Sequence, residues 1–82
     1  MRRKSVTASI RLSSISAIRD FVNRASNYHF AIDLKSGRYV VDAKSIMGIF
    51  SLDLMSPIEL TAHVTDEAEK AAFEADIKRF CA

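Results

Sequence analysis

The hydrophobic residues of this chain switch between two spacings, and the order of the switches limits the possible folds more than any other feature of the sequence. Apolar residues alternate with polar ones over residues 5–12, 30–35 and 58–64, which is the period of a half-buried strand. Over residues 16–26 and 65–80 they recur every three or four positions instead, which predicts two amphipathic helices.

Two further elements lie between residues 36 and 57. The sequence "KSGR" contains Gly37, which can adopt a positive φ, and predicts a hairpin turn followed by a returning strand, "RYVVD". The segment from Ser45 to Leu52 is long enough for two helical turns and ends before residues 53–57. The complete predicted order is βαββαβα.

The predicted helices carry capping signals at their ends. Serines between residues 13 and 16 are N-cap candidates for the first helix, and Ser45 is the candidate for the short one. Thr65 or Asp66 can cap the last helix, whose first turn is acidic and whose last turn is basic, as the helix dipole favours. The predicted buried stripe of that helix consists of Phe73, Ile77 and Phe80.

This order of elements predicts an α+β fold. Three helices can cover only one face of a four-stranded antiparallel sheet, so we expect an open-faced β-sandwich whose second face is polar. The 82 residues are enough for a single domain, residues 1–82, that buries about 60–65% of its unfolded surface. Such a thin core argues against a deep enzymatic cleft and favours a binding surface.

No sequence pattern indicates catalysis or a bound cofactor. The chain has only two glycines, Gly37 and Gly48, so it contains no phosphate-binding or dinucleotide-binding loop. We find no combination of nucleophile, base and orienting group. The single cysteine, Cys81, excludes a disulfide framework and a cysteine-based metal site, and it fits a reducing cytoplasm. We therefore expect a cytoplasmic protein that is not an enzyme and binds no metal.

The N-terminal segment leaves one alternative open. No stretch approaches the roughly 18 apolar residues of a membrane helix, so no membrane association is expected. Residues 1–19 hold five basic residues, several serines and no acid, which is also typical of organellar transit peptides. The same stretch also fits a strand followed by a helix start, and we favour that interpretation.

The charges are divided between the two halves of the sequence. Residues 1–44 carry nine Lys/Arg against three Asp/Glu, and residues 45–82 carry three against seven, so the halves have net charges of +6 and −4. A basic half can steer toward an acidic protein surface or a nucleic acid. The basic residues are scattered and accompany no aromatic-rich glycine motif, so a protein partner is favoured over nucleic acid.

One segment resembles a known family. "DAKSIMGIFSL" is similar to the sequence around the regulatory serine of HPr, the histidine-containing phosphocarrier protein of the bacterial phosphoenolpyruvate-dependent sugar phosphotransferase system. "FVNRASNY" resembles the second half of that family's first helix, and "IELTAHV" resembles its fourth strand. The resemblance covers nearly the whole chain and implies the same βαββαβα fold.

The start of the first helix departs from the family pattern. When the chain is aligned without gaps from "FVNRAS", the phosphoryl-accepting histidine falls on Ser14, the arginine on Ser16 and the proline on Ala17. A serine hydroxyl without an adjacent base is a poor nucleophile, unlike a neutral imidazole nitrogen. We therefore expect Ser14 to cap the helix and not to relay phosphate.

The resemblance also implies a regulatory site and a partner surface. Ser45 is predicted to be both a helix N-cap and a serine phosphorylated by HPr kinase with ATP. Ile46 and Met47 are the predicted partner contacts, with Phe50 and Ile18 beside them, while Ile49 and Leu52 are expected to be buried. A basic rim that steers an acidic partner is the second prediction for this surface, with a solvated helix face as the alternative. Its members are Arg19 and Arg24.

The two histidines, His29 and His63, are expected on the outward side of their strands, near enough to approach each other. Two histidines are too few for a structural zinc site, and no carrier role is expected for them.

The sequence thus predicts an HPr-like regulatory protein that docks on a transcriptional regulator or metabolic enzyme. Two alternatives stay open, an interaction module that is not phosphorylated and an atypical phosphocarrier.

Overall fold

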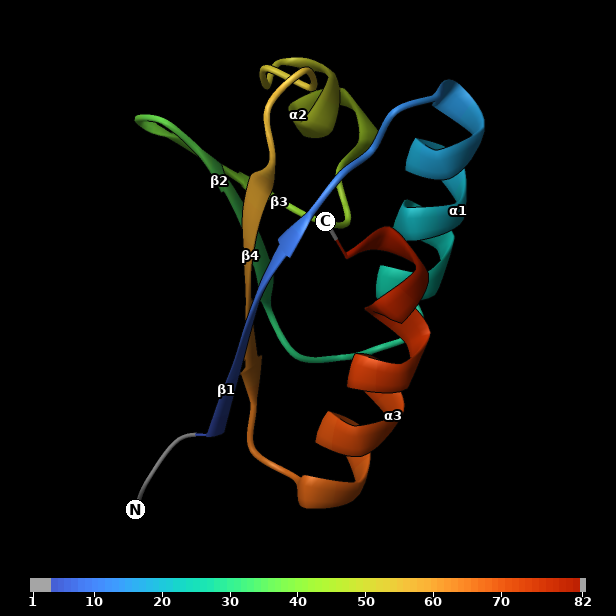
Figure 1. The fold of residues 1–82 in the computed structure, drawn as a ribbon. Coiled ribbons are helices and arrows are strands. Elements are labelled where there is room, and N and C mark those ends of the chain that lie inside the picture. Colours follow the sequence, from blue (N-terminus) through green and yellow to red (C-terminus); the bar gives the residue numbers. More distant parts are fainter. Residues whose placement is uncertain (1–3, 82) are drawn as a thin grey trace.

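A computed structural model describes residues 4–81 of the chain (Figure 1). Its elements follow the predicted βαββαβα order, with a single 3₁₀ turn, η1, after the last helix. In chain order they are β1 (Lys4–Ile10), α1 (Ile15–Ala25), β2 (Ile32–Ser36), β3 (Tyr39–Asp42), α2 (Ile46–Phe50), β4 (Ile58–Val64), α3 (Glu67–Ile77) and η1 (Lys78–Phe80).

The four strands form one antiparallel sheet in the order β1-β4-β2-β3. Figure 1 shows α1 and α3 side by side on one face of this sheet, with α2 near the end where β4 begins. The α+β open-faced sandwich predicted from the sequence is therefore confirmed.

Capping residues fix where the helices begin. Ser14 Oγ accepts a hydrogen bond from the Ala17 N–H at 3.0 Å, so α1 begins at Ile15, one residue earlier than predicted. Asp66 caps α3 by accepting from the Ala68 N–H at 2.8 Å. The basic residues expected in the last turn of α3 lie instead in η1, because the α-helix ends at Ile77.

The hairpin between β2 and β3 contains the predicted glycine turn. Gly37 adopts a φ of +60°, in the left-handed region that side chains with a Cβ rarely occupy. The register pairs Ser36 with Tyr39 across this turn and Asp33 with Asp42 at the far end of the hairpin.

The core lies between the sheet and the two long helices. The inward residues of β4, Ile58, Leu60, Ala62 and Val64, are all fully buried. Phe73, Ile77 and Phe80 form the buried stripe predicted for the C-terminal segment, and the Phe80 ring meets Phe21 of α1 edge-on with centroids 5.4 Å apart. The outward residues of β4, Glu59, Thr61 and His63, are polar and none of them is buried, so the second face of the sheet is open to solvent, as expected.

Candidate functional site

Ser45 is the N-cap of α2. Its Oγ accepts a hydrogen bond from the Gly48 N–H at 3.2 Å, and its carbonyl accepts from the Ile49 N–H at 3.1 Å. The residue is half-buried and has extended backbone angles, φ −108° and ψ 106°. The predicted capping role is confirmed, and because Oγ serves as the acceptor, this bond does not use the hydroxyl proton.

Gly48 brings α2 close to the sheet. A Cβ at this position would lie 3.2 Å from the Val41 Cβ and 3.3 Å from Ser45 Oγ. These distances are tighter than ordinary van der Waals contacts. The glycine therefore permits both the approach of α2 to β3 and the undisturbed cap.

Several large apolar side chains gather around α2 and the start of α1. Ile15, Met47, Phe50 and Met55 are between 45% and 86% exposed, and we refer to these four residues as the apolar patch. A groove of about 430 Å³ runs between the two elements, and Ile15, Phe50 and Met55 line it together with Leu54 and Ile18. Exposed apolar side chains that line one groove, as Ile15, Phe50 and Met55 do, are typical of protein-binding surfaces. Met47 lies on the same short helix as Phe50.

The predicted contact residues differ in how accessible they are. Met47 is 76% exposed and Phe50 is 45% exposed, whereas Ile46 is half-buried against the core. Ile18 is only 2% exposed, so the prediction that it is a surface contact is wrong. It shares the inward face of α1 with Phe21, three positions further on, and contributes only to the floor of the groove. Ile49 and Leu52 are buried, as predicted.

Ser14 lies between this apolar groove and a polar hollow of about 630 Å³. The hollow is lined by the serines at the start of α1 together with Arg11, Asp20, Asn23 and Arg79. No acidic residue occupies the first turn of α1. Although Ser14 lines both the groove and the polar hollow, its hydroxyl oxygen is engaged as the N-cap of α1.

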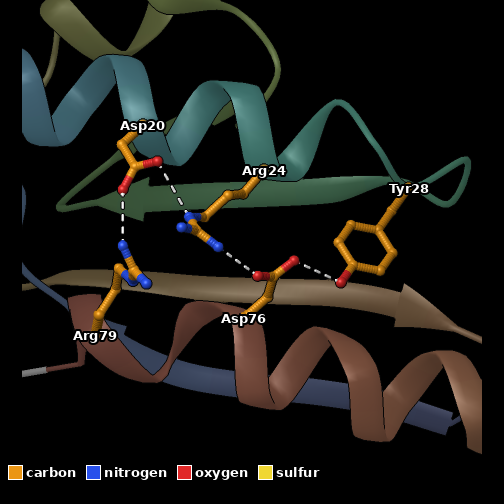
Figure 2. A network of polar contacts seen from close by, with 5 residues as sticks. All are labelled: Asp20, Arg24, Tyr28, Asp76 and Arg79. Carbon is orange, nitrogen blue, oxygen red and sulfur yellow. Dashed lines mark hydrogen bonds and ion pairs between the residues drawn. The ribbon is translucent and has the colours of Figure 1, made fainter.

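The two arginines predicted to form one rim point to different parts of the molecule. Arg19 is exposed and lines a shallow hollow with Ile46, next to α2. Arg24 binds Asp20 through Nε at 3.1 Å and Asp76 of α3 through Nη1 at 2.6 Å (Figure 2). The prediction of a shared basic rim is therefore wrong for Arg24, because its guanidinium group is paired with the carboxylates of Asp20 and Asp76.

Tyr28 completes this network, which we call the α1–α3 clamp: Asp20, Arg24, Tyr28, Asp76 and Arg79 (Figure 2). The Tyr28 hydroxyl donates to Asp76 Oδ2 at 2.7 Å, and Arg79 reaches Asp20 at 3.4 Å. Burial and the bond to Asp76 raise the pKa of Tyr28 to about 12. The hydrogen bonds from Tyr28 and then Arg24 hold the pKa of Asp76 below its usual value, although burial opposes them.

The two histidines each have a carboxylate partner. His63 lies on the outer face of the sheet with Nε2 2.9 Å from Asp33 Oδ2. His29 lies in the connection before β2, with Nε2 2.9 Å from Glu69 Oε2 of α3, so the expectation that it faces outward from a strand is wrong. Within residues 4–81 no group of three or more His, Cys, Asp or Glu side chains is arranged to hold a metal ion.

Comparisons with known proteins identify the family. Residues 15–81 match the family model described as the PTS HPr component phosphorylation site. The chain belongs to the HPr family. Among proteins with curated functions, none matches it by sequence.

Solved HPr structures resemble the whole fold. The HPr-C-His structure from Thermoanaerobacter tengcongensis is 32% identical with a TM-score of 0.70, over 90% of this chain and 89% of that one. A phosphocarrier protein HPr from Bacillus anthracis str. Ames is 28% identical with a TM-score of 0.63, over 93% of this chain and 98% of that one.

Membership of the HPr family agrees with the predicted fold and function class. HPr proteins are phosphocarriers of the phosphotransferase system and interact with its other proteins; they are not enzymes. In the part of the chain that the structure describes, no helix is both long and apolar enough to span a bilayer.

One contact beside Ser45, which is made by Lys44, was not indicated by the sequence. The Lys44 ammonium donates to the backbone carbonyls of Tyr28 at 2.6 Å and Phe30 at 3.0 Å. A lysine before a helix cap resembles any solvated surface lysine in sequence, and its acceptors are backbone atoms 14 and 16 positions away. No sequence signal points to such a contact.

Proposed function

We propose that this HPr-family protein is a regulator that docks on a larger protein through α2 and the apolar patch, with phosphorylation of Ser45 governing the docking. The observation that carries the proposal is the position of Ser45: it opens α2, two residues before Met47, which is 76% exposed. A phosphate there would adjoin the apolar patch directly.

The chemistry of a phosphoserine suits such a switch. A phosphoserine adds about two negative charges and three acceptor oxygens at neutral pH. A partner with an arginine cluster beside an apolar pocket would recognise both the phosphate and the side chains of Met47 and Phe50. A partner without that cluster would lose affinity, because the charge would adjoin its apolar contact surface. The partner class that we propose is a transcriptional regulator or a metabolic enzyme.

We further propose that the chain does not carry phosphate on a histidine. In the alignment that motivates this proposal, Ser14 stands where the family has its phosphoryl acceptor, and the Ser14 oxygen is engaged as a helix cap. The two histidines are each paired with a carboxylate, one on the outer sheet face and one beside α3. Neither histidine lines the groove or the polar hollow at the start of α1.

An alternative is an HPr-family interaction module that docks without phosphorylation. The exposed apolar patch supports that function equally, because its side chains need no modification to bind. An atypical phosphocarrier is a third possibility, and it requires labelling by phosphoenolpyruvate.

The test is the intact mass of the protein after two separate incubations, one with ATP and HPr kinase and one with phosphoenolpyruvate and enzyme I. The proposal predicts a gain of one phosphate with ATP alone, absent in Ser45→Ala and retained in Ser51→Ala, which alters a serine at the other end of the same helix. Labelling by phosphoenolpyruvate would refute the loss of the carrier function. If neither incubation adds a phosphate, the alternative function, a module that docks without phosphorylation, is supported instead.

A further inference from the structure

Helix α2 has few internal means of holding its position. It contains five residues, of which Ile49 is buried, and two local side-chain bonds at its ends: Ser45 Oγ accepts from the Gly48 N–H, and Ser51 Oγ donates to the Gly48 carbonyl at 2.6 Å. A helix this short is unstable in isolation because its nucleation is unfavourable. The placement of Met47 and Phe50 therefore depends on contacts from outside the helix.

Lys44 supplies such a contact immediately before the cap. Its ammonium group donates to the carbonyls of Tyr28 and Phe30, and its own backbone N–H donates to Asp42 Oδ1 at 2.8 Å. The ammonium site is half-buried, and hydrogen bonds from a charged donor are stronger than those between neutral groups. Lys44 therefore joins the start of α2 to the connection between α1 and β2.

That connection is itself fixed to the scaffold. The Tyr28 hydroxyl binds Asp76 of α3, and the Tyr28 ring packs edge-on against Phe73 with centroids 5.1 Å apart. The Phe30 ring contacts Phe73 as well, at 5.4 Å. The acceptors of the Lys44 ammonium are thus held by the aromatic core and do not move freely.

We propose that Lys44 is the positioning residue of the docking surface: its ammonium group fixes where α2 begins and so sets the positions of Ser45, Met47 and Phe50. This role deepens the proposed docking function and takes its significance from it. The stabilisation itself is local, and it is measurable without any partner.

Amide hydrogen exchange of α2 tests the positioning role. Lys44→Met keeps the length of the side chain and removes its donors, and we expect the exchange rates of the Gly48 and Ile49 amides to rise by about tenfold or more, the factor expected for a lost charged hydrogen bond. Amides of α3 should change much less. Lys35→Met, at an exposed lysine on the outer face of β2, is the matched control and should leave α2 unchanged. An equal rise in α2 and α3 would overturn the proposal, because it would indicate only a general loss of stability.

A second measurement uses the unaltered chain, in case Lys44→Met folds poorly. The ¹H–¹⁵N signal of the Lys44 ammonium should be visible at low temperature, because its protons are held in hydrogen bonds, whereas that of Lys35 should be lost to exchange with water. Lys44→Arg should give α2 exchange rates between those of the natural chain and Lys44→Met. A Lys44 ammonium that exchanges as fast as Lys35 would overturn the inference.

A kinase assay separates this inference from the proposed function. With HPr kinase and ATP, Lys44→Met should raise the KM for the protein substrate several-fold more than it lowers kcat, because the kinase must bind α2 in the position that Lys44 maintains. If the kinase leaves even the natural chain unmodified, the proposed phosphorylation fails while the exchange measurements still decide the role of Lys44. A KM equal to that of the natural chain would contradict the positioning role.

Discussion

The Tyr28–Asp76 hydrogen bond makes a prediction that joins a mutation to a pH range. Tyr28→Phe removes only the hydroxyl, and the ring contacts with Phe30 and Phe73 remain. The lost bond is a 2.7 Å hydrogen bond to a carboxylate that is 27% exposed. Bonds to charged groups contribute about 1.5–3 kcal/mol, and partial exposure reduces the value, so we expect a loss of about 1–2 kcal/mol in the free energy of unfolding at pH 7.

The alkaline range tests the burial of the Tyr28 phenol together with its bond to Asp76, because both raise its pKa. The pKa of Tyr28 is about 12 in the folded chain, against 10.0 for an ordinary tyrosine. Because the folded value is raised, the stabilisation is fully present below pH 10 and is lost as the pH rises from 10 to 12. Each pKa unit corresponds to about 1.4 kcal/mol, so the total loss is at most about 2–3 kcal/mol. Tyr28→Phe has no phenol at this position and should lack this component of the alkaline loss.

The assay is urea unfolding followed by far-UV circular dichroism for both chains at pH 7 and at steps from pH 9 to 12. The free-energy difference between the natural chain and Tyr28→Phe should shrink steadily above pH 10. Tyr39→Phe, at a phenol that is 69% exposed on β3, is the matched control and should follow the natural chain. A difference that stays constant from pH 9 to pH 12 would refute the reasoning.

Three further predictions concern Asp76, the cap residue Ser45 and the buried Ile18. Asp76→Asn should reduce the acid-dependent loss of stability: the lowered pKa of Asp76 means that its contribution is present above about pH 4 and is lost as the pH falls further, which unfolding curves at pH 2–6 would measure. Ser45→Ala should cost about 1 kcal/mol through loss of the N-cap, whereas Ser45→Asp, which retains a capping oxygen, should cost much less in the same urea assay. Ile18→Ala should cost about 2–5 kcal/mol because it opens a cavity in the core, and Met47→Ala less than about 0.5 kcal/mol; equal values would contradict the division between core and patch.

Local patterns in the sequence were sufficient to predict the fold. Strand alternation and helical spacing depend on residues within one element, and so do the caps at Ser14 and Asp66, which the structure confirms. Even the buried stripe at Phe73 and Ile77 follows from spacing alone. Together with the resemblance to HPr, these patterns were sufficient for the architecture.

The site was predicted less completely because its contacts join distant parts of the sequence. Arg24 reads as a surface charge, but its partner Asp76 lies 52 positions away. Ile18 reads as a neighbour of the exposed apolar residues, yet the direction in which α1 packs buries it. Helical spacing gives the relative direction of side chains on a helix, and only packing decides which direction faces the core.

The arrangement separates the parts of the molecule that bear stability from the part proposed to bind. The clamp joins the two long helices, and the aromatic core fixes the connection that holds Lys44. The apolar patch, in contrast, lies on α2, on Met55 after it and on the first residue of α1, where side chains such as Met47 contribute little to the core. A phosphate on Ser45 would replace one capping oxygen with several, so it should preserve the cap while changing the charge of the surface. The proposed switch should therefore alter the affinity for a partner far more than the free energy of unfolding, and a phosphorylated form much less stable than the natural chain would contradict it.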